Sequence, residues 1–512
     1  MKEKQKTILL LLNGLGISLG MNGNAVAAAK PAIFSKLWHE NFHQPISPNI
    51  GQNSMTPETQ YLSFVTGENV TTGYNSIAKS FHESIWEDNK AILATFDYSK
   101  RHNSAINLIG TISKHNFDKK IKVFHNLFKI AGKHALYNIR LHLFIDNDFD
   151  DMDDLGNHLA KIERLIGTTR IGEIATVMGK NFVSDFTAQN SMIQKSFQVI
   201  LKSTGKKYLS ISQGLAHWQH IKPEQIEPTS FVSNVHSVTH INSFDSIFFF
   251  DFEFAETNKL LSLFLSQRSI AVVDKNLRHL NLASLVSPLI ANRQILNTAF
   301  PLEQDENLLE EISRANRKTS FYSEDYRYQL YHGLLMPDKR FDHEYIVETP
   351  RKMDTYGQHY QKLTQSIFDK AIKDMQSDMD FLLIDVPMIE RLCDLGDYKK
   401  VVEGIKFLDG CIERLKSAIL ENGDVLIIAS LYGMAEAMKW QNFPETGVSF
   451  CQLSQSPVPF IVLNGESAKQ NKRHIIHEIA SSNHHVSDLG KNILHLIGVN
   501  NQHFGGKIFA GK

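Results

Sequence analysis

The sequence predicts an α/β fold in which parallel sheets are covered by helices. Short apolar runs alternate along the chain with longer stretches of helical periodicity, the order expected of parallel strands joined by helical crossovers. The runs are almost entirely apolar, as strands buried on both faces are. The predicted strands are residues 8–12, 106–110, 139–145, 174–178, 247–252, 270–273, 381–386, 425–429 and 458–463.

The clearest predicted helix spans residues 398–420. Its apolar residues recur at alternating steps of four and three and so share one face. They are Val401, Ile405, Leu408, Ile412, Leu415 and Ile419. Asn422 and Gly423 are typical of a helix end, and a predicted strand follows them. We interpret this stripe as core packing within a strand, helix, strand crossover over residues 381–429.

Length and charge set the broad class of protein. A chain of 512 residues is long enough for two or more domains, and the 42% hydrophobic content is ordinary for a globular protein. Lysine plus arginine (54) nearly cancels aspartate plus glutamate (55). No bulk field attracts nucleic acid or an anionic membrane, so we expect neither as a partner.

Cysteine usage and the N-terminal segment indicate a cytoplasmic protein. Cys393, Cys411 and Cys451 have neither metal-ligand spacing nor the even number of a disulfide framework, which fits a reducing compartment. Residues 8–12 follow three lysines, as the apolar region of a signal peptide would. Asn13 and several glycines interrupt the run after five aliphatic residues, and a buried first strand is the better interpretation.

Two polar, charge-rich stretches, residues 66–87 and 304–327, are the predicted passages between domains. The motifs outside them occur in an informative order. They are LLLLNGLG (9–16), NAV (24–26), Lys30-Pro31, Leu37-Trp38, HLFID (142–146), MGKNFVSD (178–185), DSIFFFDFEF (245–254), DFLLIDV (380–386), SPVPFIVLNG (456–465), SDLGKNILHLIG (487–498) and GGK (505–507). In this order and spacing they resemble cofactor-independent phosphoglycerate mutase, a relative of alkaline phosphatase.

The resemblance implies a fold, a domain layout and a reaction. It implies an alkaline-phosphatase-like parallel-sheet domain over residues 1–76 and 311–512, and an inserted phosphotransferase-like α/β domain over residues 77–310. The family's reaction is an isomerisation in glycolysis that converts 3-phosphoglycerate to 2-phosphoglycerate through a phosphoserine. It uses two Mn²⁺ or Zn²⁺ ions held by aspartates and histidines, which activate the nucleophile and neutralise the transferring phosphoryl group.

At the metal-binding positions that the resemblance implies, the ligands are mostly replaced. Asn13 stands where the first aspartate is expected and offers an amide oxygen without charge. Glu390 and Asp394 match an Asp-x-x-x-His pair and are either remnant ligands or exposed acids on a loop. An adjacent Asp-His pair is matched by Leu431 and Tyr432, which cannot bind a hard dication. The last histidine of the family's set is matched by Leu453.

The position of the nucleophile is open between two residues. Asn53-Ser54 resembles the family's Asn-Ser pair, which makes Ser54 the candidate nucleophile. An alignment through Glu58 instead places the turn at Thr56-Pro57, so Thr56 is the alternative. A serine without flanking cations has no reason to ionise.

The positions that would hold the anionic substrate carry the wrong charge. Where the family has arginines, Glu253 and Glu256 reverse the sign, and two carboxylates repel a phosphate. The remaining implied positions are occupied by Lys180 and Phe186 in place of an arginine pair, by Asn147, Asp148 and Phe149 in place of Gly-Arg-Asp, by Asp118 with His115 nearby in place of a histidine, and by Arg317 or Lys318 at a basic position bridging the domains. Lys180 and Arg317 are the candidate substrate-binding residues.

The sequence therefore predicts a two-domain relative of phosphoglycerate mutase that has lost the family's reaction and its metal ions. We expect a monomeric, cytoplasmic pseudoenzyme with a binding or scaffolding role toward an unknown protein or small molecule. Two alternatives stay open: a weak metal-dependent mutase using Ser54, Asn13, Glu390 and Asp394, or a phosphotransferase or hydrolase repurposed for an uncharged or cationic substrate.

Overall fold

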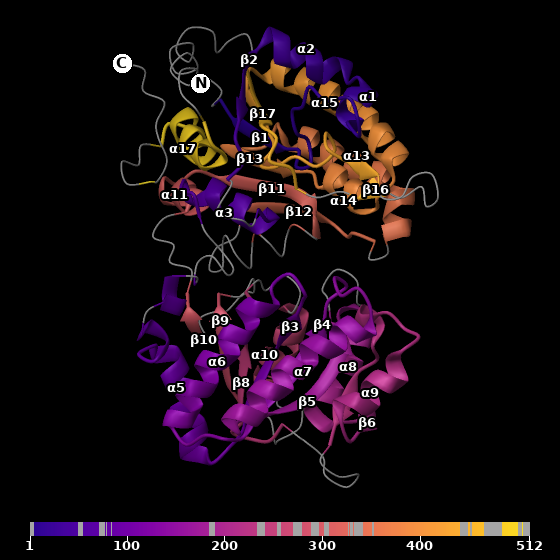
Figure 1. Cartoon of the computed structure of the whole chain (residues 1–512). Coiled ribbons are helices and arrows are strands. Elements are labelled where there is room, and N and C mark those ends of the chain that lie inside the picture. The colour runs from indigo at the N-terminus through magenta and orange to yellow at the C-terminus, as the bar shows by residue number, and fades with distance from the viewer. Residues whose placement is uncertain are drawn as a thin grey trace. The chain divides into compact units, whose positions relative to one another are not determined.

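The chain divides into two compact units, the first comprising Met1–Thr71 and Gln304–Lys512 and the second Thr72–Glu303 (Figure 1). The second unit is thus inserted into the sequence of the first. The sequence analysis places the two boundaries after residues 76 and 310, whereas the units divide after Thr71 and Glu303. The structure, a computed structural model, describes residues 5–49, 55–70, 77, 79–82, 84–183, 190–232, 241–252, 258–269, 279–287, 296–301, 307–325, 327, 331, 341–350, 353–440, 449–450, 453–464, 484–499 and 504.

The first unit is built on a mainly parallel sheet. Its described strands lie in the order β12-β11-β13-β1-β14-β17-β2, and β17 runs antiparallel to both of its neighbours. The strands are β1 (Thr7–Leu11), β2 (Phe42–Ile46), β11 (Thr319–Glu324), β12 (His343–Val347), β13 (Phe381–Asp385), β14 (Val425–Ala429) and β17 (Val458–Asn464). A separate ribbon pairs β15 (Lys439–Trp440) with β16 (Ser449–Phe450). The central strand β1 is buried along its whole length.

Helices complete the first unit: α1 (Ala25–Ala29), α2 (Ala32–Glu40), α3 (Pro57–Thr66), α11 (Leu308–Arg314), α13 (Met353–Asp374), α14 (Met388–Asp394), α15 (Tyr398–Asn422) and α17 (Val486–Leu496). The longest described helix, α15, begins at the N-cap Asp397 and ends at Gly423, whose positive φ of 71° favours glycine. Its buried residues include the whole predicted stripe from Val401 to Ile419. The helix prediction is confirmed.

The second unit has its own mixed sheet, whose described strands lie in the order β10-β9-β8-β3-β4-β5-β7-β6. They are β3 (Ile106–Ile112), β4 (Ile139–Ile145), β5 (Glu173–Gly179), β6 (Lys206–Tyr208), β7 (Thr229–Phe231), β8 (Ser246–Phe249), β9 (Asn281–Val286) and β10 (Asn297–Phe300). All neighbouring pairs are parallel except β5 with β7.

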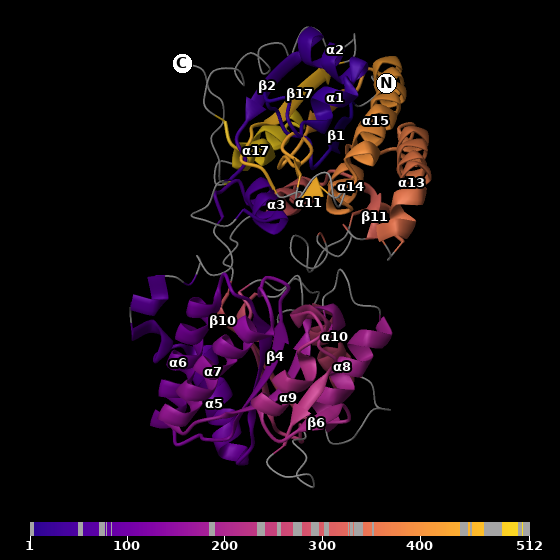
Figure 2. The same cartoon turned by 45° about the vertical axis from the view of Figure 1, so that its right-hand side comes forward.

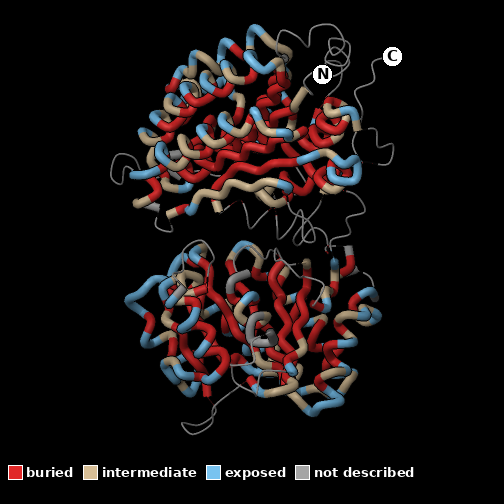
Figure 3. The backbone as a smooth tube through the Cα atoms, turned by 180° about the vertical axis from the view of Figure 1, so that it is seen from behind, coloured by how far each residue is buried: buried red, intermediate tan, exposed pale blue. Residues whose placement is uncertain are grey.

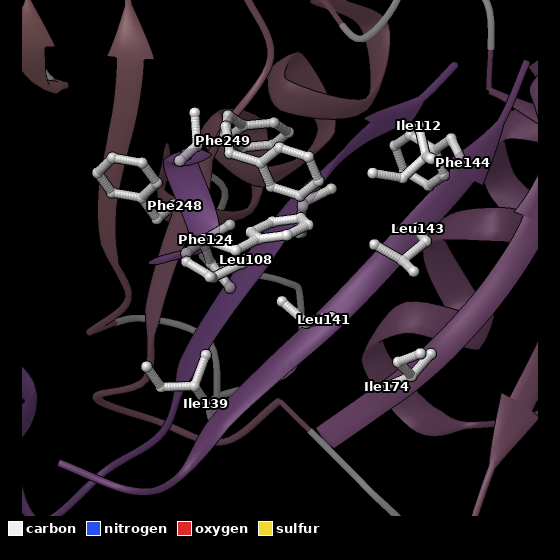
Figure 4. Close-up of a cluster of buried hydrophobic side chains, with 14 of the residues drawn as sticks. Leu108, Ile112, Phe124, Ile139, Leu141, Leu143, Phe144, Ile174, Phe248 and Phe249 are labelled. Carbon is white, nitrogen blue, oxygen red and sulfur yellow. The ribbon is translucent and has the colours of Figure 1, made fainter. Parts of the chain in front are cut away.

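The helices of the second unit are α5 (Lys90–His102), α6 (Phe117–Lys133), α7 (Met152–Thr169), α8 (Asn190–Lys202), α9 (Ile211–Trp218) and α10 (Asn258–Ser269), with short 3₁₀ turns at Lys79–His82, Ser84–Trp86, Lys180–Phe182 and Pro223–Gln225. Side chains of the central strands and of α6 form the core of this unit (Figure 4). Phe124 of α6, for example, packs edge-on against Phe250 directly after β8. All the described residues of this cluster belong to the second unit.

The strand predictions are confirmed wherever the structure describes them. Figure 3 shows the strands of both sheets buried along most of their length, whereas the helices alternate between buried and exposed positions. The strand predicted at 270–273 lies outside the described residues. The sequence pattern missed β11, whose polar sequence TSFYSE is nevertheless fully buried, and the edge strand β2. It also missed β6, β7, β9, β10, β12, β15 and β16. Among the described residues, no helix combines the length and apolarity that crossing a membrane requires.

Candidate functional site

The carboxyl ends of three neighbouring strands meet in the first unit. Parallel pairing sets Leu11 at the end of β1 beside Asp385 at the end of β13 and Ala429 at the end of β14. In open α/β sheets this edge is where ligands bind. Asn13, Glu390 and Leu431 follow these strand ends closely in sequence, so sheet topology brings the predicted metal positions to one place.

Gly14 allows α14 to approach this edge closely. Its φ is 95°, and a Cβ atom added there would stand 2.9 Å from the backbone nitrogen of Glu390. Glu390 is consequently buried on the first turns of α14 rather than exposed on a loop. The alternative interpretation of Glu390 as an exposed loop acid is wrong. Asp394, the last residue of α14, is exposed.

Asn13 is fully buried, and both ends of its amide group are in hydrogen bonds. Its Nδ2 donates to the hydroxyl of Tyr61 on α3 at 2.6 Å, and its Oδ1 accepts from the backbone N–H of Leu431 at 2.8 Å. The Tyr61 hydroxyl in turn donates to Asp385 at 2.5 Å. Asn13 therefore joins the ends of β1 and β14 to a buried tyrosine and a buried carboxylate.

The guanidinium of Arg327 lies among these groups, 1% exposed. Its Nη2 donates to the carboxylate of Glu390 and to the Tyr432 hydroxyl, the latter at 2.9 Å. Its Nε lies 3.7 Å from Asp385 Oδ1. The guanidinium carbon also stacks over the Tyr61 ring, 4.9 Å from its centroid. One protein cation thus serves both buried carboxylates.

Two further tyrosines donate hydrogen bonds to the carboxylates. Tyr331 donates to Asp385 at 3.1 Å, and Tyr432 donates to Glu390 at 2.6 Å. Burial raises the pKa of Tyr331 well above its ordinary value, so this hydroxyl keeps the proton that it donates. Burial also raises the pKa of Asp385, against the opposing effect of Arg327. We call these seven residues the Arg327 cluster: Asn13, Tyr61, Arg327, Tyr331, Asp385, Glu390 and Tyr432.

The Arg327 cluster does not fit a divalent metal ion. Mn²⁺ or Zn²⁺ needs several anionic or imidazole donors with lone pairs directed at the ion. Here Glu390 already bonds to a guanidinium and a phenol, and the Asn13 oxygen accepts a backbone N–H. Throughout the described part of the chain, no group of three or more His, Cys, Asp or Glu side chains is placed to hold a metal ion.

The candidate nucleophile Ser54 lies outside the described residues. The alternative, Thr56, has a structural role as the N-cap of α3. Its hydroxyl accepts from the backbone N–H of Thr59 at 3.3 Å, and Thr59 Oγ1 accepts from the backbone N–H of Thr56 at 3.1 Å. A hydroxyl used in this reciprocal capping stabilises the helix start. Leu431 is buried and Leu453 is half-buried.

In the second unit, two basic residues at or near the predicted substrate positions form ion pairs with aspartates. Lys180 Nζ lies 3.1 Å from Asp146 Oδ1 at the carboxyl edge of β4 and β5. Asp148 Oδ2 accepts a hydrogen bond from the ring nitrogen Nδ1 of His115 at 2.7 Å. Although burial opposes it, hydrogen bonding to His115 lowers the pKa of Asp148 to about 2, while the same bond raises the pKa of His115. Lys180 and His115 are therefore each paired with the carboxylate of an aspartate.

The other predicted substrate positions take no part in such a site. Arg317 donates to the carbonyl of Ile497 at the end of α17 at 3.2 Å and lies 3.5 Å from Asp380. Its contacts are therefore within the first unit. Asp118 is exposed in the first turn of α6, Asn147 is exposed and Phe149 is buried. Phe186, Glu253 and Glu256 lie outside the described residues.

Sequence reasoning missed the residue at the centre of the cluster. Arg327 ends the stretch predicted to link domains, and its partner Glu390 stands 63 positions away. Tyr61 and Asp385 are 324 positions apart. Besides Asn13, Glu390 and Tyr432, which the motifs single out, the sequence offers Asp385, a carboxylate at the end of an otherwise apolar predicted strand.

Comparison with known proteins identifies what the chain is similar to. The family model described as "BPG-independent PGAM N-terminus" matches residues 77–287. A 2,3-bisphosphoglycerate-independent phosphoglycerate mutase of Francisella tularensis is 24% identical over 97% of both chains. One from Clostridium perfringens is 22% identical over 91% of this chain and 92% of its own. The chain resembles cofactor-independent phosphoglycerate mutase. The resemblance predicted from the motifs is thereby confirmed.

Solved structures extend the likeness to the fold. A crystal structure of Leishmania mexicana phosphoglycerate mutase matches with a TM-score of 0.77 over 99% of this chain and 98% of its own, at 14% identity. This confirms the predicted fold class, with its split parallel-sheet domain and inserted α/β domain. The phosphoglycerate mutase fold is retained, whereas the edge of its first sheet holds the Arg327 cluster.

Proposed function

We propose that the protein is a catalytically degenerate relative of phosphoglycerate mutase with a binding or scaffolding role. The observation that carries this proposal is the buried guanidinium of Arg327, bonded to Glu390 at the sheet edge where the resemblance implies metal ions. An arginine stays protonated at every physiological pH, so this cation is permanent. Glycolytic isomerase activity, bound Mn²⁺ and a phosphoserine are accordingly not part of the proposed role.

Charge supports the proposal. A dication brought to the Arg327 cluster would meet a fixed positive charge in a site that excludes water, where repulsion is poorly screened. It would also have to break the bonds from Arg327 and Tyr432 to Glu390. Leaving a guanidinium buried without its carboxylate costs several kcal/mol, roughly 3 to 5. Metal binding therefore competes with the stability of the fold.

The test combines metal binding with turnover. Calorimetric titration of the purified full chain with Mn²⁺ and with Zn²⁺ is expected to show no stoichiometric binding, and 3-phosphoglycerate is expected to remain unconverted in an enolase-coupled assay. The phosphoglycerate mutase of Francisella tularensis, prepared in parallel, serves as the positive control. Conversion that depends on added metal would refute the proposal and favour the weakly active alternative.

The proposal also covers the oligomeric state, the location and the partner of the protein. We infer a monomer in the cytoplasm whose partner is a protein or a small molecule, on the basis of the near-zero net charge and the cysteine usage. Size-exclusion chromatography with light scattering measures the oligomeric state. A stable dimer at micromolar concentration would refute the monomer.

A further inference from the structure

A cavity of about 470 Å³ lies in the first unit between α1, α2, α15 and the segment that follows β1. Figure 2 shows α1 and α2 beside α15, and both helices contact it. None of the described residues that line the cavity belongs to the Arg327 cluster. The volume falls within the range of small-molecule sites in proteins. The cavity is therefore a candidate site separate from the sheet edge.

The walls of the cavity are apolar and come from well-packed elements. One wall is the face of α15 that carries Ile405, Leu408 and Ile412, which recur at steps of three and four. The facing wall is α2, with the rings of Phe34 and Trp38. Both rings are only half-buried, so apolar surface remains available to a ligand. Such walls suit an aliphatic or aromatic body.

Two polar groups that line the cavity are already satisfied. The carboxylate of Asp409 accepts the backbone N–H groups of Ile33 at 2.9 Å and Phe34 at 2.8 Å, at the start of α2. Asn24 accepts from Ala27 at 2.8 Å as the N-cap of α1, and its amide group donates to two carbonyl groups in the preceding loop. Neither group needs a ligand as a hydrogen-bond partner.

Lys30 differs from them. It lines the cavity, is exposed, and forms no ion pair or hydrogen bond through its ammonium with any residue that the structure describes. Asp409, the acidic residue of the lining, is engaged with the α2 backbone instead. The cavity thus combines apolar walls with one ammonium group that has no ion pair among the described residues. A ligand with an apolar body and an anionic head is complementary to this arrangement.

We propose that this cavity binds a small amphipathic anion, a molecule with a single anionic head and an apolar body. The body lies between the rings of α2 and the stripe of α15, and the head lies beside Lys30. Burial of the body supplies most of the affinity, and the ammonium selects the sign of the head. This site is independent of the proposed function, because it uses no residue of the Arg327 cluster.

Dodecanoate, kept below its micellar concentration, is the probe. Calorimetric titration of the full chain is expected to show one site with micromolar affinity. Dodecyltrimethylammonium has the same chain length and a cationic head, and should bind at least about tenfold more weakly. Equal binding of the two probes, or no binding of dodecanoate, would overturn the proposal.

Matched variants locate the site. Ala27→Trp fills the cavity and is expected to weaken dodecanoate binding at least about tenfold, whereas Ala28→Trp, at the adjacent exposed position outside the lining, should leave it unchanged. Lys30→Gln should weaken it about twofold to fivefold, whereas Lys30→Arg should retain it. Lys36→Gln, on the exposed face of α2, should have no effect. Wild-type affinity in Ala27→Trp would overturn the assignment.

Two other occupants are excluded by separate measurements. If the cavity instead received a second copy of the chain, sedimentation would show a dimer that Ala27→Trp dissociates. If it received a membrane lipid, the protein would sediment with phosphatidylglycerol vesicles in a Lys30-dependent way. Either result would overturn the proposal of a free small anion, while a monomer that ignores vesicles supports it.

Discussion

At the residue scale, Arg327 determines the chemistry of the sheet edge. It lies in a fully buried cluster with two carboxylates and three tyrosines, and each carboxylate accepts from at least one tyrosine hydroxyl. Buried ion pairs of this kind add little stability over a well-packed apolar cluster, but removing one partner is costly. The arginine is therefore required by the carboxylates that surround it, whatever the role of the whole protein.

Replacing Arg327 by methionine tests this dependence. We expect the free energy of unfolding of the first unit to fall by about 3–5 kcal/mol, because Asp385 and Glu390 would stay buried without their cation. Urea unfolding followed by circular dichroism measures the change. The double variant Arg327→Met with Glu390→Gln should recover part of the loss, since one unpaired charge is removed. A double variant whose loss equals the sum of the two single losses would argue against coupling.

Asn13→Asp tests whether the missing aspartate can simply be returned. The change removes the N–H that Asn13 donates to Tyr61 and adds a buried carboxyl near Asp385. We expect a loss of about 1–3 kcal/mol in the free energy of unfolding and no gain of Mn²⁺ binding. Burial raises the pKa of the new carboxyl in the folded state only, so the loss should be larger at pH 8 than at pH 5.

Asn422→Asp provides the matched control for that experiment. Asn422 is the exposed last residue of α15, so its replacement adds the same charge without burial. Its effect should stay below about 1 kcal/mol and should be the same at both pH values. An Asn13→Asp protein as stable as wild type at pH 8, or one that binds Mn²⁺ stoichiometrically, would contradict our account of the cluster.

At the element scale, the sequence predicts the helices and strands whose residues follow a clear local pattern. The runs at β1, β13 and β14 are apolar throughout, and the α15 stripe has an unambiguous helical spacing, so these elements and their burial follow from the residues themselves. β11 could not be predicted this way because its serines and its glutamate resemble a loop. It is a strand because β12 and β13 pair with it on both sides.

The same limit applies to the cluster. Asn13 could be singled out because a motif surrounds it, but its partner Tyr61 comes from another helix and its neighbour Asp385 from another strand. Arg327 belongs to no recognisable pattern. Contacts between residues hundreds of positions apart depend on how the sheet edge and the covering helices meet, which periodicity does not encode.

Glu324, the last residue of β11, makes this strand sensitive to pH. It is fully buried and accepts from the hydroxyls of Tyr356 at 2.9 Å and Thr349 at 3.0 Å. Burial, opposed by Tyr356 and Arg391, raises the pKa of Glu324 to about 7. The folded state therefore binds a proton that the unfolded chain has already released above about pH 4.5. Its contribution to stability is present below that pH and is lost as pH rises toward 7.

Glu324→Gln should remove this loss. We expect the variant to gain stability over wild type as pH rises from 5 to 8, by an amount on the order of 3 kcal/mol at most, because a neutral amide replaces a carboxylate that must ionise in a buried site. Unfolding curves at pH 5 and pH 8 measure the difference. Glu421→Gln, on the exposed end of α15, is the control and should change nothing with pH. A variant with the pH profile of wild type would contradict this role for Glu324.

At the scale of the whole molecule, the chain shares its fold with phosphoglycerate mutase, and charged groups described in each unit pair within that unit. In the first unit Arg327 lies between two carboxylates of the sheet edge, and in the second Lys180 and His115 pair with aspartates. The fold is recognisable from apolar patterns that many residues share, whereas the sheet edge depends on a few residues that no such pattern marks.

Because its described hydrophobic cluster is built from its own residues, the second unit should fold alone. Every residue of its hydrophobic cluster lies between Ile77 and Ala299, inside the inserted segment Thr72–Glu303. A domain of this size buries enough apolar surface to be stable without a neighbour. We expect the isolated segment to show helix and strand signals in circular dichroism and one cooperative thermal transition. In the full chain, Arg327→Met should lower the transition of the first unit and leave this one within a few degrees of its value in the isolated segment. An unfolded segment, or a second-unit transition that follows the Arg327 substitution, would mean that the two units depend on each other for stability.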